Sequence, residues 1–369
     1  MNDVLRRILR PAGGGVYVVS TGVAEQRALQ RRIYGAASDE EIDARWHAAL
    51  ARLDGPDRPR VVVLGVPSDT GAGFTRGANR APGAIRSWLL DRKEHPIWAP
   101  DVIDAGDVFV VPQLLTDEML APGQIAATRV ALYGDAAVDL PVAPLDLCER
   151  AIAEIHARHP GAAVVVIGGD HSVGWPAFRA AWQHWDQARG KRIGLLHFDA
   201  HTDLLETRLG IKYCFATWAW HANALLGRDG RLVQVGVRAS AKPQDHWEET
   251  LGVRQIRAEE ANERGADALA DEIGARFERL GVEVLYVSND IDGTSDEYAA
   301  ATGTPEGGGL TPALVRGLTQ RLAARFPLVG GDLVEVAPPL AGGVAGEPAR
   351  TLGVAGEYLD DLVRWGRAG

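Results

Sequence analysis

Acidic and histidine residues gather at three points of the chain, each directly after an apolar run. The motifs are GGDHS at residues 168–172, DAHTD at residues 199–203 and SNDIDG at residues 288–293. In an extended chain, side chains two residues apart point to the same side, so the second and third motifs each direct two or more ionisable groups together. Any one motif could be a structural or solvated turn. Unpaired charge at the edge of a core is costly, however, and a metal ion removes that cost.

The three motifs together predict a metal centre. Its six ligands would be His171, Asp199, His201, Asp203, Asp290 and Asp292. Oxygen and imidazole nitrogen without thiolate suit manganese, and these ligand types also admit nickel, zinc and iron. Four carboxylates balance the charge of two divalent ions, so we expect two Mn²⁺ per subunit and a fold that the metal stabilises.

Such a site predicts hydrolysis. Two ions about 3.5–4 Å apart can share a water, lower its pKa towards neutrality and place hydroxide against an electrophilic carbon. Cleavage of a phosphate ester would usually bring a glycine-rich cradle or well-placed Arg and Lys residues, and the sequence shows neither convincingly.

The elements that position these motifs follow an alternating pattern. Continuous apolar runs, typical of parallel strands buried on both faces, occur at Val61–Val66, Val102–Ile103, Ala163–Ile167, Arg192–Phe198, Leu232–Val237, Val282–Val287 and Leu328–Val336. Helical stretches lie between them, at Leu145–Arg158, Pro176–Arg189, Ala266–Leu280 and Thr311–Arg325. The alternation predicts a three-layer α/β domain whose ligands bind beyond the carboxyl ends of the strands, where the motifs lie.

The remaining sequence divides the chain and limits its partners. Residues 1–58 are expected to form a helical extension, and residues 59–369 a catalytic domain with a surface excursion at about 110–145. The net charge of -10 and the absence of a basic run disfavour nucleic acid as a partner. No apolar stretch is long enough to cross a membrane, and the N-terminus is interpreted as an arm rather than a signal peptide. With only Cys148 and Cys214, a cytoplasmic, reducing location is expected.

The motifs and their order resemble those of the ureohydrolase family, which includes arginases and agmatinases. The resemblance extends over roughly residues 60–365, through GVPSD at 65–69, ATGTP at 301–305, GGGL at 307–310 and DLVEV at 332–336. It implies an arginase-type parallel sheet of about eight strands, a binuclear manganese site and a homo-oligomer, trimer or hexamer.

The resemblance also implies a role for each residue. Asp199 and Asp290 would bridge the two ions, His171 with Asp203 would complete one coordination sphere, and His201 with Asp292 would complete the other. Asp203 would also hold the bridging hydroxide and pass its proton onward. Glu335 would pair with the guanidinium of the substrate, whose hydrolysis would release urea and an amine.

Several positions depart from the family pattern. Where the family usually carries a His-Gly-Thr step with a proton-shuttling histidine, this chain has Cys214-Phe215-Ala216-Thr217. His221 is the candidate replacement, although a histidine in an aromatic helical run is more often packed in the core. The polar loops with which an arginase grasps an α-amino acid are replaced by less polar sequence.

These features favour a small agmatine-like guanidino compound over arginine as substrate. Two alternatives stay open. One is hydrolysis of a formimino or amide C–N bond, and the other is a metal-binding, non-catalytic or regulatory subunit of the same family.

Overall fold

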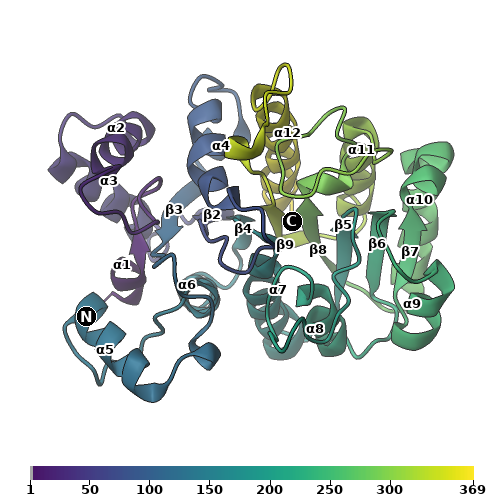
Figure 1. The fold of residues 1–369 in the computed structure, drawn as a ribbon, viewed down its shortest axis with the longest axis horizontal. Coiled ribbons are helices and arrows are strands. Elements are labelled where there is room, and N and C mark those ends of the chain that lie inside the picture. The colour runs from purple at the N-terminus through teal and green to yellow at the C-terminus, as the bar shows by residue number, and fades with distance from the viewer. Residues whose placement is uncertain (1–2) are drawn as a thin grey trace.

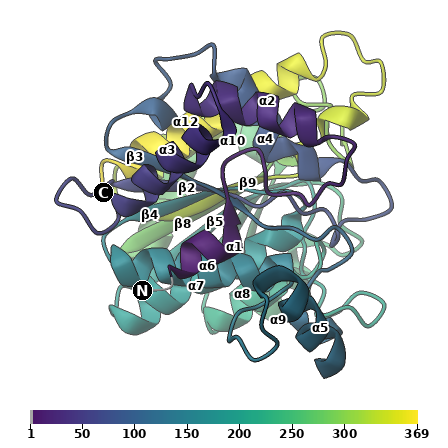
Figure 2. The same cartoon turned by 90° about the vertical axis from the view of Figure 1, so that its left-hand side faces the viewer.

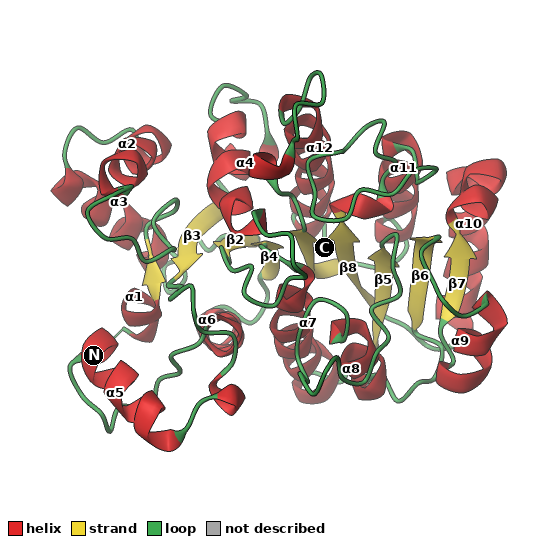
Figure 3. Cartoon of the chain, viewed as in Figure 1, coloured by secondary structure: helices red, strands yellow, loops and turns green. Residues whose placement is uncertain are grey.

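A nine-stranded sheet crosses the whole molecule. The computed structural model describes residues 3–369. The strands are β1 (Leu9–Arg10), β2 (Val61–Gly65), β3 (Val102–Val108), β4 (Ala163–Ile167), β5 (Ile193–Phe198), β6 (Leu232–Val237), β7 (Arg254–Arg257), β8 (Val284–Asp290) and β9 (Leu328–Val334). Their spatial order is β1-β3-β2-β4-β9-β8-β5-β6-β7, and every neighbouring pair is parallel except β1 with β3 (Figure 3).

Helices cover both faces of the sheet. They are α1 (Val4–Ile8), α2 (Val23–Tyr34), α3 (Asp39–Ala51), α4 (Ala81–Leu89), α5 (Pro122–Tyr133), α6 (Pro144–Arg158), α7 (Gly174–Trp182), α8 (Trp218–Leu225), α9 (Gln244–Leu251), α10 (Ala258–Arg279), α11 (Pro312–Ala323) and α12 (Ala349–Gly366). In Figure 1, α4, α12, α11 and α10 lie above the sheet and α6 to α9 lie below it. The prediction of a three-layer α/β domain is therefore confirmed, with a nine-stranded, mostly parallel sheet.

Each face of the sheet has its own apolar core. One core joins α4, α10, α11 and α12 to side chains such as Val63, Leu196 and Val287. The other joins α1, α6, α7 and α8 to side chains such as Val62 and Leu195, which point the opposite way along the same strands. Because both faces are covered, all residues of β2, β4, β5, β6, β8 and β9 are buried, as the continuous apolar runs predicted.

The N-terminal segment contributes the helices α1, α2 and α3 and also a strand. β1 pairs antiparallel with β3 at one edge of the sheet, and α1 lies against α6 (Figure 2). The helix α3 packs against β3 and shares the apolar core of α1 and α6 through Trp46 and Leu50. The stretch at residues 110–145 contains the helix α5 and, at its end, the start of α6. None of the helices described between residues 3 and 369 combines the length and apolar composition that a bilayer crossing needs.

A buried arginine ties the N-terminal segment to the sheet. Arg86 of α4 is fully buried and donates from Nε to Asp104 over 2.7 Å and from Nη1 to Asp107 over 2.5 Å. The second oxygen of Asp107 accepts hydrogen bonds from the backbone amides of Gly13 and Gly15, at 2.7 and 3.2 Å. Any side chain at Gly15 would collide with Asp107, so glycine is required for this approach.

Candidate metal centre

The four motifs expected to form the site follow four neighbouring central strands. GGDHS follows β4, the DLVEV segment ends β9, SNDIDG ends β8 and DAHTD follows β5. These strands are adjacent in the order β4-β9-β8-β5 and all run parallel. Their carboxyl ends therefore meet at one edge of the sheet, where the structure brings together all six predicted metal ligands.

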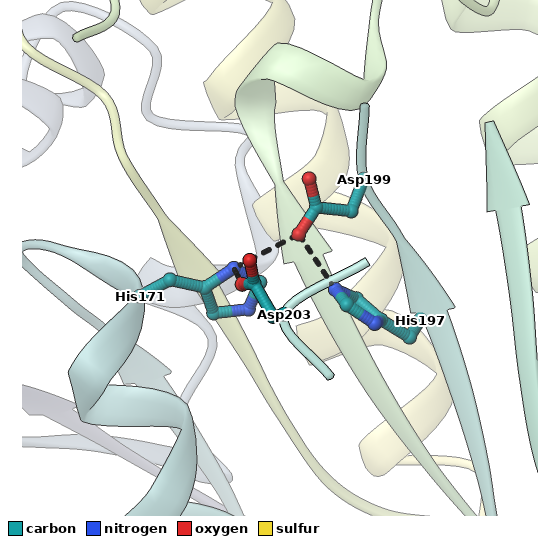
Figure 4. Close-up of side chains that lie close together, drawn as sticks. All are labelled: His171, His197, Asp199 and Asp203. Carbon is teal, nitrogen blue, oxygen red and sulfur yellow. Dashed lines mark hydrogen bonds and ion pairs between the residues drawn. The ribbon is translucent and has the colours of Figure 1, made fainter. Parts of the chain in front are cut away.

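The first half of the site surrounds one nitrogen of His171. Its Nδ1 lies 2.9 Å from an oxygen of Asp290, 3.2 Å from one of Asp203 and 3.3 Å from one of Asp199. All four side chains are buried. Figure 4 shows Asp199 and Asp203, from the segment after β5, close to the ring of His171. This half of the site thus offers one nitrogen and three carboxylates.

The other ring nitrogen of His171 determines which tautomer the neutral ring adopts. Nε2 lies 3.0 Å from the hydroxyl of Ser288, and that hydroxyl donates to Asp332 over 2.7 Å. Tyr286 donates to the second oxygen of Asp332, also over 2.7 Å. Because the Ser288 hydroxyl gives its only hydrogen to Asp332, it accepts from Nε2–H of His171. Nδ1 then presents a lone pair to the three carboxylates, as a metal ligand must.

The second half of the site is formed by Asp199, His201 and Asp292. Nδ1 of His201 lies 3.4 Å from Oδ1 of Asp199 and 3.2 Å from Oδ2 of Asp292. Asp199 therefore contributes Oδ2 to the first half and Oδ1 to the second. Thr304 donates to Oδ2 of Asp292 over 2.8 Å and the amide of Ala200 donates to its Oδ1, so the carboxylate is held in place.

His197 is a buried neighbour of the site that the sequence analysis missed. Its Nε2 lies 2.9 Å from Oδ2 of Asp199, so it could be counted among the metal-holding groups (Figure 4). The amide nitrogen of Gln234 faces both the carbonyl of Thr202, at 2.6 Å, and Nδ1 of His197, at 3.0 Å.

The contacts of Gln234 identify His197 as a hydrogen-bond donor. A carbonyl oxygen can only accept a hydrogen bond, so the Gln234 atom that faces Thr202 is the amide nitrogen. The same nitrogen donates to Nδ1 of His197, which is therefore an acceptor. The hydrogen of the neutral His197 ring is therefore on Nε2 and is donated to Asp199. The alternation of His197, Asp199, His201 and Asp203 along the chain is the signal that could have identified His197, but His197 lies inside a buried strand, where the apolar run hides it.

The pKa values in the cluster reflect how closely its charged groups lie. Burial alone would raise the pKa of Asp199, but hydrogen bonds from His171, His197 and His201 hold it well below its ordinary value. Burial, followed by the nearby carboxylates of Asp292 and Asp199, raises the pKa of Asp290 well above its ordinary value. The cluster thus contains more negative charge than its own histidines balance.

A pair of divalent ions fits these residues. Nδ1 of His171 is buried and has no hydrogen-bond partner of good geometry, although three carboxylates surround it. Burial alone would lower the pKa of His171, yet those carboxylates raise it well above its ordinary value, so the site favours positive charge at this point. Two groups of side chains could each hold an ion, and they share Asp199: His171, His197, Asp199 and Asp203 in one, and Asp199, His201 and Asp292 in the other.

Glu335 and Asp203 both lie at the site in unusual backbone conformations. Their φ angles are 60° and 51°, in the left-handed region that residues with a side chain rarely adopt. Oε1 of Glu335 accepts from the amide of His171 over 2.8 Å, and burial followed by the charge of Asp170 raises the pKa of Glu335 well above its ordinary value. Oδ2 of Asp203 accepts from the indole of Trp218 over 3.0 Å.

His221, the candidate replacement for the shuttling histidine, lies in α8 among aromatic rings. Its Nε2 is 3.0 Å from the carbonyl of Lys212 and 3.1 Å from that of Glu206, and its ring lies against Tyr213 and Trp175. Burial lowers the pKa of His221. These contacts hold the loop that precedes α8, and a part in proton transfer stays a prediction.

Comparison with known proteins gives a consistent result. Residues 59–354 match the model of the arginase family. The chain is 33% identical over 302 residues to guanidinopropionase from Pseudomonas aeruginosa, covering 79% of this chain and 83% of that protein. It is 32% identical over 286 residues to mitochondrial agmatinase from Gallus gallus, covering 74% of this chain and 73% of that protein.

A solved structure supports the same relationship. Proclavaminate amidino hydrolase from Streptomyces clavuligerus superposes with a TM-score of 0.66 at 27% identity, covering 86% of this chain and 95% of that one. The family match, the relatives and the His/Asp clusters agree. The chain therefore belongs to the arginase family, as a ureohydrolase-type hydrolase that acts on linear amidines.

Proposed function

We propose that this protein hydrolyses a small guanidino-alkyl compound to urea and an amine, using two divalent metal ions held by His171, Asp199, His201, Asp203, Asp290 and Asp292. The observation that carries the proposal is the convergence of these six side chains at the carboxyl ends of the parallel strands β4, β8 and β5. A bound pair of divalent ions lowers the pKa of a water and so supplies the nucleophile for hydrolysis.

Glu335 is the residue that would bind the guanidinium. It is the carboxylate at the end of β9, and its oxygen Oε1 is already oriented by the His171 amide at 2.8 Å. Its raised pKa indicates a buried carboxyl group that lacks a cationic partner. A guanidinium would supply that partner and form charge-assisted hydrogen bonds, which would hold the electrophilic carbon above the metal ligands.

Asp203 would accept the proton that is released. Trp218 donates to its Oδ2 and thereby fixes the orientation of the carboxylate. Burial, followed by the negative charge of Asp199, raises the pKa of Asp203. A carboxyl group with a raised pKa is a better proton acceptor than an exposed one and can return the proton to the leaving nitrogen.

The substrate itself is proposed on narrower grounds. The loops after β5 and β6 lack the polar character expected for a clamp on an α-amino acid, which favours agmatine or another guanidino-alkyl compound without an α-amino-acid group over arginine. The relatives named above include a guanidinopropionase and an agmatinase. In the compounds to which both names refer, a simple alkyl chain joins the guanidinium to one charged end.

Urea release tests the proposal. Purified protein loaded with Mn²⁺ would be assayed with agmatine, arginine, 4-guanidinobutyrate, 3-guanidinopropionate and guanidine. We expect urea from at least one alkyl compound, none from Asp203→Asn, and full activity from Asp267→Asn, an exposed carboxylate that serves as the matched control. Absence of urea from every compound, with two metal ions bound per chain, would overturn the proposal. Formamide from a formimino substrate would then support the alternative hydrolase.

Three further properties complete the proposal. The metal is proposed to be manganese, and the assembly is proposed to be a homo-oligomer of three or six chains. The location is proposed to be the cytoplasm, because the two cysteines are buried thiols that form no disulfide. Metal analysis of protein purified without added metal and light scattering of the eluted protein test the first two. Zinc or iron at two ions per chain, or a monomer, would contradict them.

A further inference from the structure

A cavity of about 540 Å³ lies beside the metal centre, between two loops. One is the glycine-rich loop after β2, from Thr70 to Phe74, and the other is the loop after β5, from Arg208 to Phe215. We call it the tail cavity; its wall is mostly apolar and includes Leu115, Met119 and Leu120. Phe74 and Leu209 are fully exposed at its rim.

The tail cavity shares a wall with the catalytic site. The amide of Gly71 donates to Oδ2 of Asp170 over 3.0 Å, and Asp170 directly precedes the metal ligand His171. The amide of Phe215 in turn donates to the carbonyl of Gly71 over 3.1 Å. The glycine-rich loop also comes near Glu335. Thr75, the next residue after Phe74, and Glu335 both lie close to Gly303. A substrate whose guanidinium lies on Glu335 therefore meets this loop with the rest of its length.

Arg208 is the one charged residue that lines the tail cavity. Its guanidinium lies over the ring of Phe215, 4.9 Å from the ring centroid, and this stacking directs it along the cavity wall. Arg208 forms no ion pair with any residue in the part of the chain that the structure describes, whereas Lys212 on the same loop is paired with Glu118 at 3.4 Å. The positive charge of Arg208 is thus not balanced within the subunit.

We propose that the tail cavity receives the end of the substrate remote from the guanidinium, and that Arg208 selects a tail ending in a carboxylate. The protein would then be a guanidino-acid hydrolase rather than an agmatinase. This inference rests on the proposed function, since it assigns the tail of that substrate. Arginine presents a fork of donors that matches a carboxylate, whereas the terminal ammonium of agmatine would meet a like charge. The apolar wall suits the methylene chain between the two ends.

Two substrates that differ at the tail provide the test. Agmatine and 4-guanidinobutyrate both carry a guanidinium on a short alkyl chain, ending in an ammonium and a carboxylate respectively. We expect kcat/KM for 4-guanidinobutyrate to exceed that for agmatine. Arg208→Gln should lower kcat/KM for 4-guanidinobutyrate by about fivefold, which corresponds to about 1 kcal/mol for a charge pair with an exposed arginine. Arg208→Glu should invert the preference towards agmatine.

The matched control is Lys212→Glu, which makes the same charge change on the same loop outside the cavity wall. It should leave the ratio of the two kcat/KM values within about twofold, as expected for an exposed charge that is screened by solvent. A preference for agmatine in the unmodified protein would overturn the inference, as would a ratio that Arg208→Glu and Lys212→Glu change equally.

The inference and the proposed function can fail separately. Urea from agmatine alone would retain the proposed function and reject the role of Arg208. If neither compound gave urea, the proposed function would fail, and calorimetric binding of both compounds to metal-loaded protein would still examine the cavity. Weaker binding of 4-guanidinobutyrate to Arg208→Glu than to the unmodified protein would support the carboxylate site, and equal binding would reject it.

Discussion

Replacement of Gln234 by leucine should weaken metal binding although Gln234 touches no metal ligand. Its amide nitrogen donates to Nδ1 of His197 at 3.0 Å and to the carbonyl of Thr202 at 2.6 Å, and its oxygen accepts from Gln255 at 2.7 Å. Without that donor, the hydrogen of His197 is free to move to Nδ1. Nε2 would then present a lone pair to Oδ2 of Asp199, where it now donates over 2.9 Å.

The size of the effect follows from the partners that are lost. Leucine leaves two buried polar groups, on His197 and Gln255, without a partner, each at a cost of about 1–3 kcal/mol, and also removes the donor to the partly buried carbonyl of Thr202. We therefore expect the metal-free protein to lose roughly 2 kcal/mol or more in its free energy of unfolding. Loss of a group that orients a metal ligand typically weakens metal binding by about 10- to 100-fold, and we expect a change of this size in the Kd for Mn²⁺.

Two measurements separate these effects. Calorimetric titration with Mn²⁺ gives the Kd, and urea denaturation of the metal-free protein gives the stability. Gln255→Leu is the control, because it removes one contact of Gln234 but leaves both of its donated hydrogen bonds; it should lower stability with little change in Kd. If Gln234→Leu lowered stability while its Kd stayed within about twofold of the unmodified protein, the argument from the His197 tautomer would be refuted.

Three further predictions concern metal, pH and the buried arginine. Removing metal with EDTA should lower the free energy of unfolding by about 2.7 kcal/mol per independent site, compared with protein in Mn²⁺ at 100 times its Kd. An unchanged melting temperature would contradict a bound metal. Burial lowers the pKa of His156 from 6.5 to about 3, so the unfolded chain binds more protons between these values and stability is lost as pH falls through this range. Between pH 7 and pH 5, the free energy of unfolding of His156→Leu should therefore fall by about 2 kcal/mol less than that of the unmodified protein, as measured by denaturant unfolding. Equal decreases in the two proteins would argue against a lowered pKa of His156. Arg86→Met would leave two buried carboxylates without their cation and should cost about 3–5 kcal/mol, measured in the same way, and a cost below 1 kcal/mol would show that the carboxylates find other partners.

The convergence of the six side chains proposed as metal ligands could be predicted from sequence because it depends on local rules. Apolar runs predicted the strands β4, β5, β8 and β9, and parallel strands bring their carboxyl ends to one edge. The ligand motifs follow those runs directly. Placing them together required only that the four strands be neighbours in one sheet, which the observed order satisfies.

Two strands escaped prediction for a physical reason. β7, with the sequence RQIR, lies at an edge of the sheet and buries only its two central residues, so it lacks the apolar run of a central strand. β1 is two residues long and is recognisable only through its pairing with Val108 and Asp107 of β3. Edge strands with few buried positions carry little periodicity for a sequence to display.

The polar network around the ligands could not be predicted either. Ser288 and Asp332 are contributed by neighbouring strands, and Gln234 lies on a third, so no spacing in the sequence links them to His171 or His197. Their roles depend on which atom of each side chain faces which partner. That information exists only once the strands are in register.

The backbone at Asp203 and Glu335 sets a limit on how stable this enzyme can become. A residue with a side chain in the left-handed region costs of order 1–3 kcal/mol, and glycine would relieve most of that cost at either position. Glycine there would also remove the carboxylate that is proposed to move the proton or to bind the guanidinium. A search for heat-resistant variants of the metal-free protein that ignored activity, in which Asp203 contributes no metal binding, should therefore enrich glycine at these two positions, and the variants it selected would be inactive.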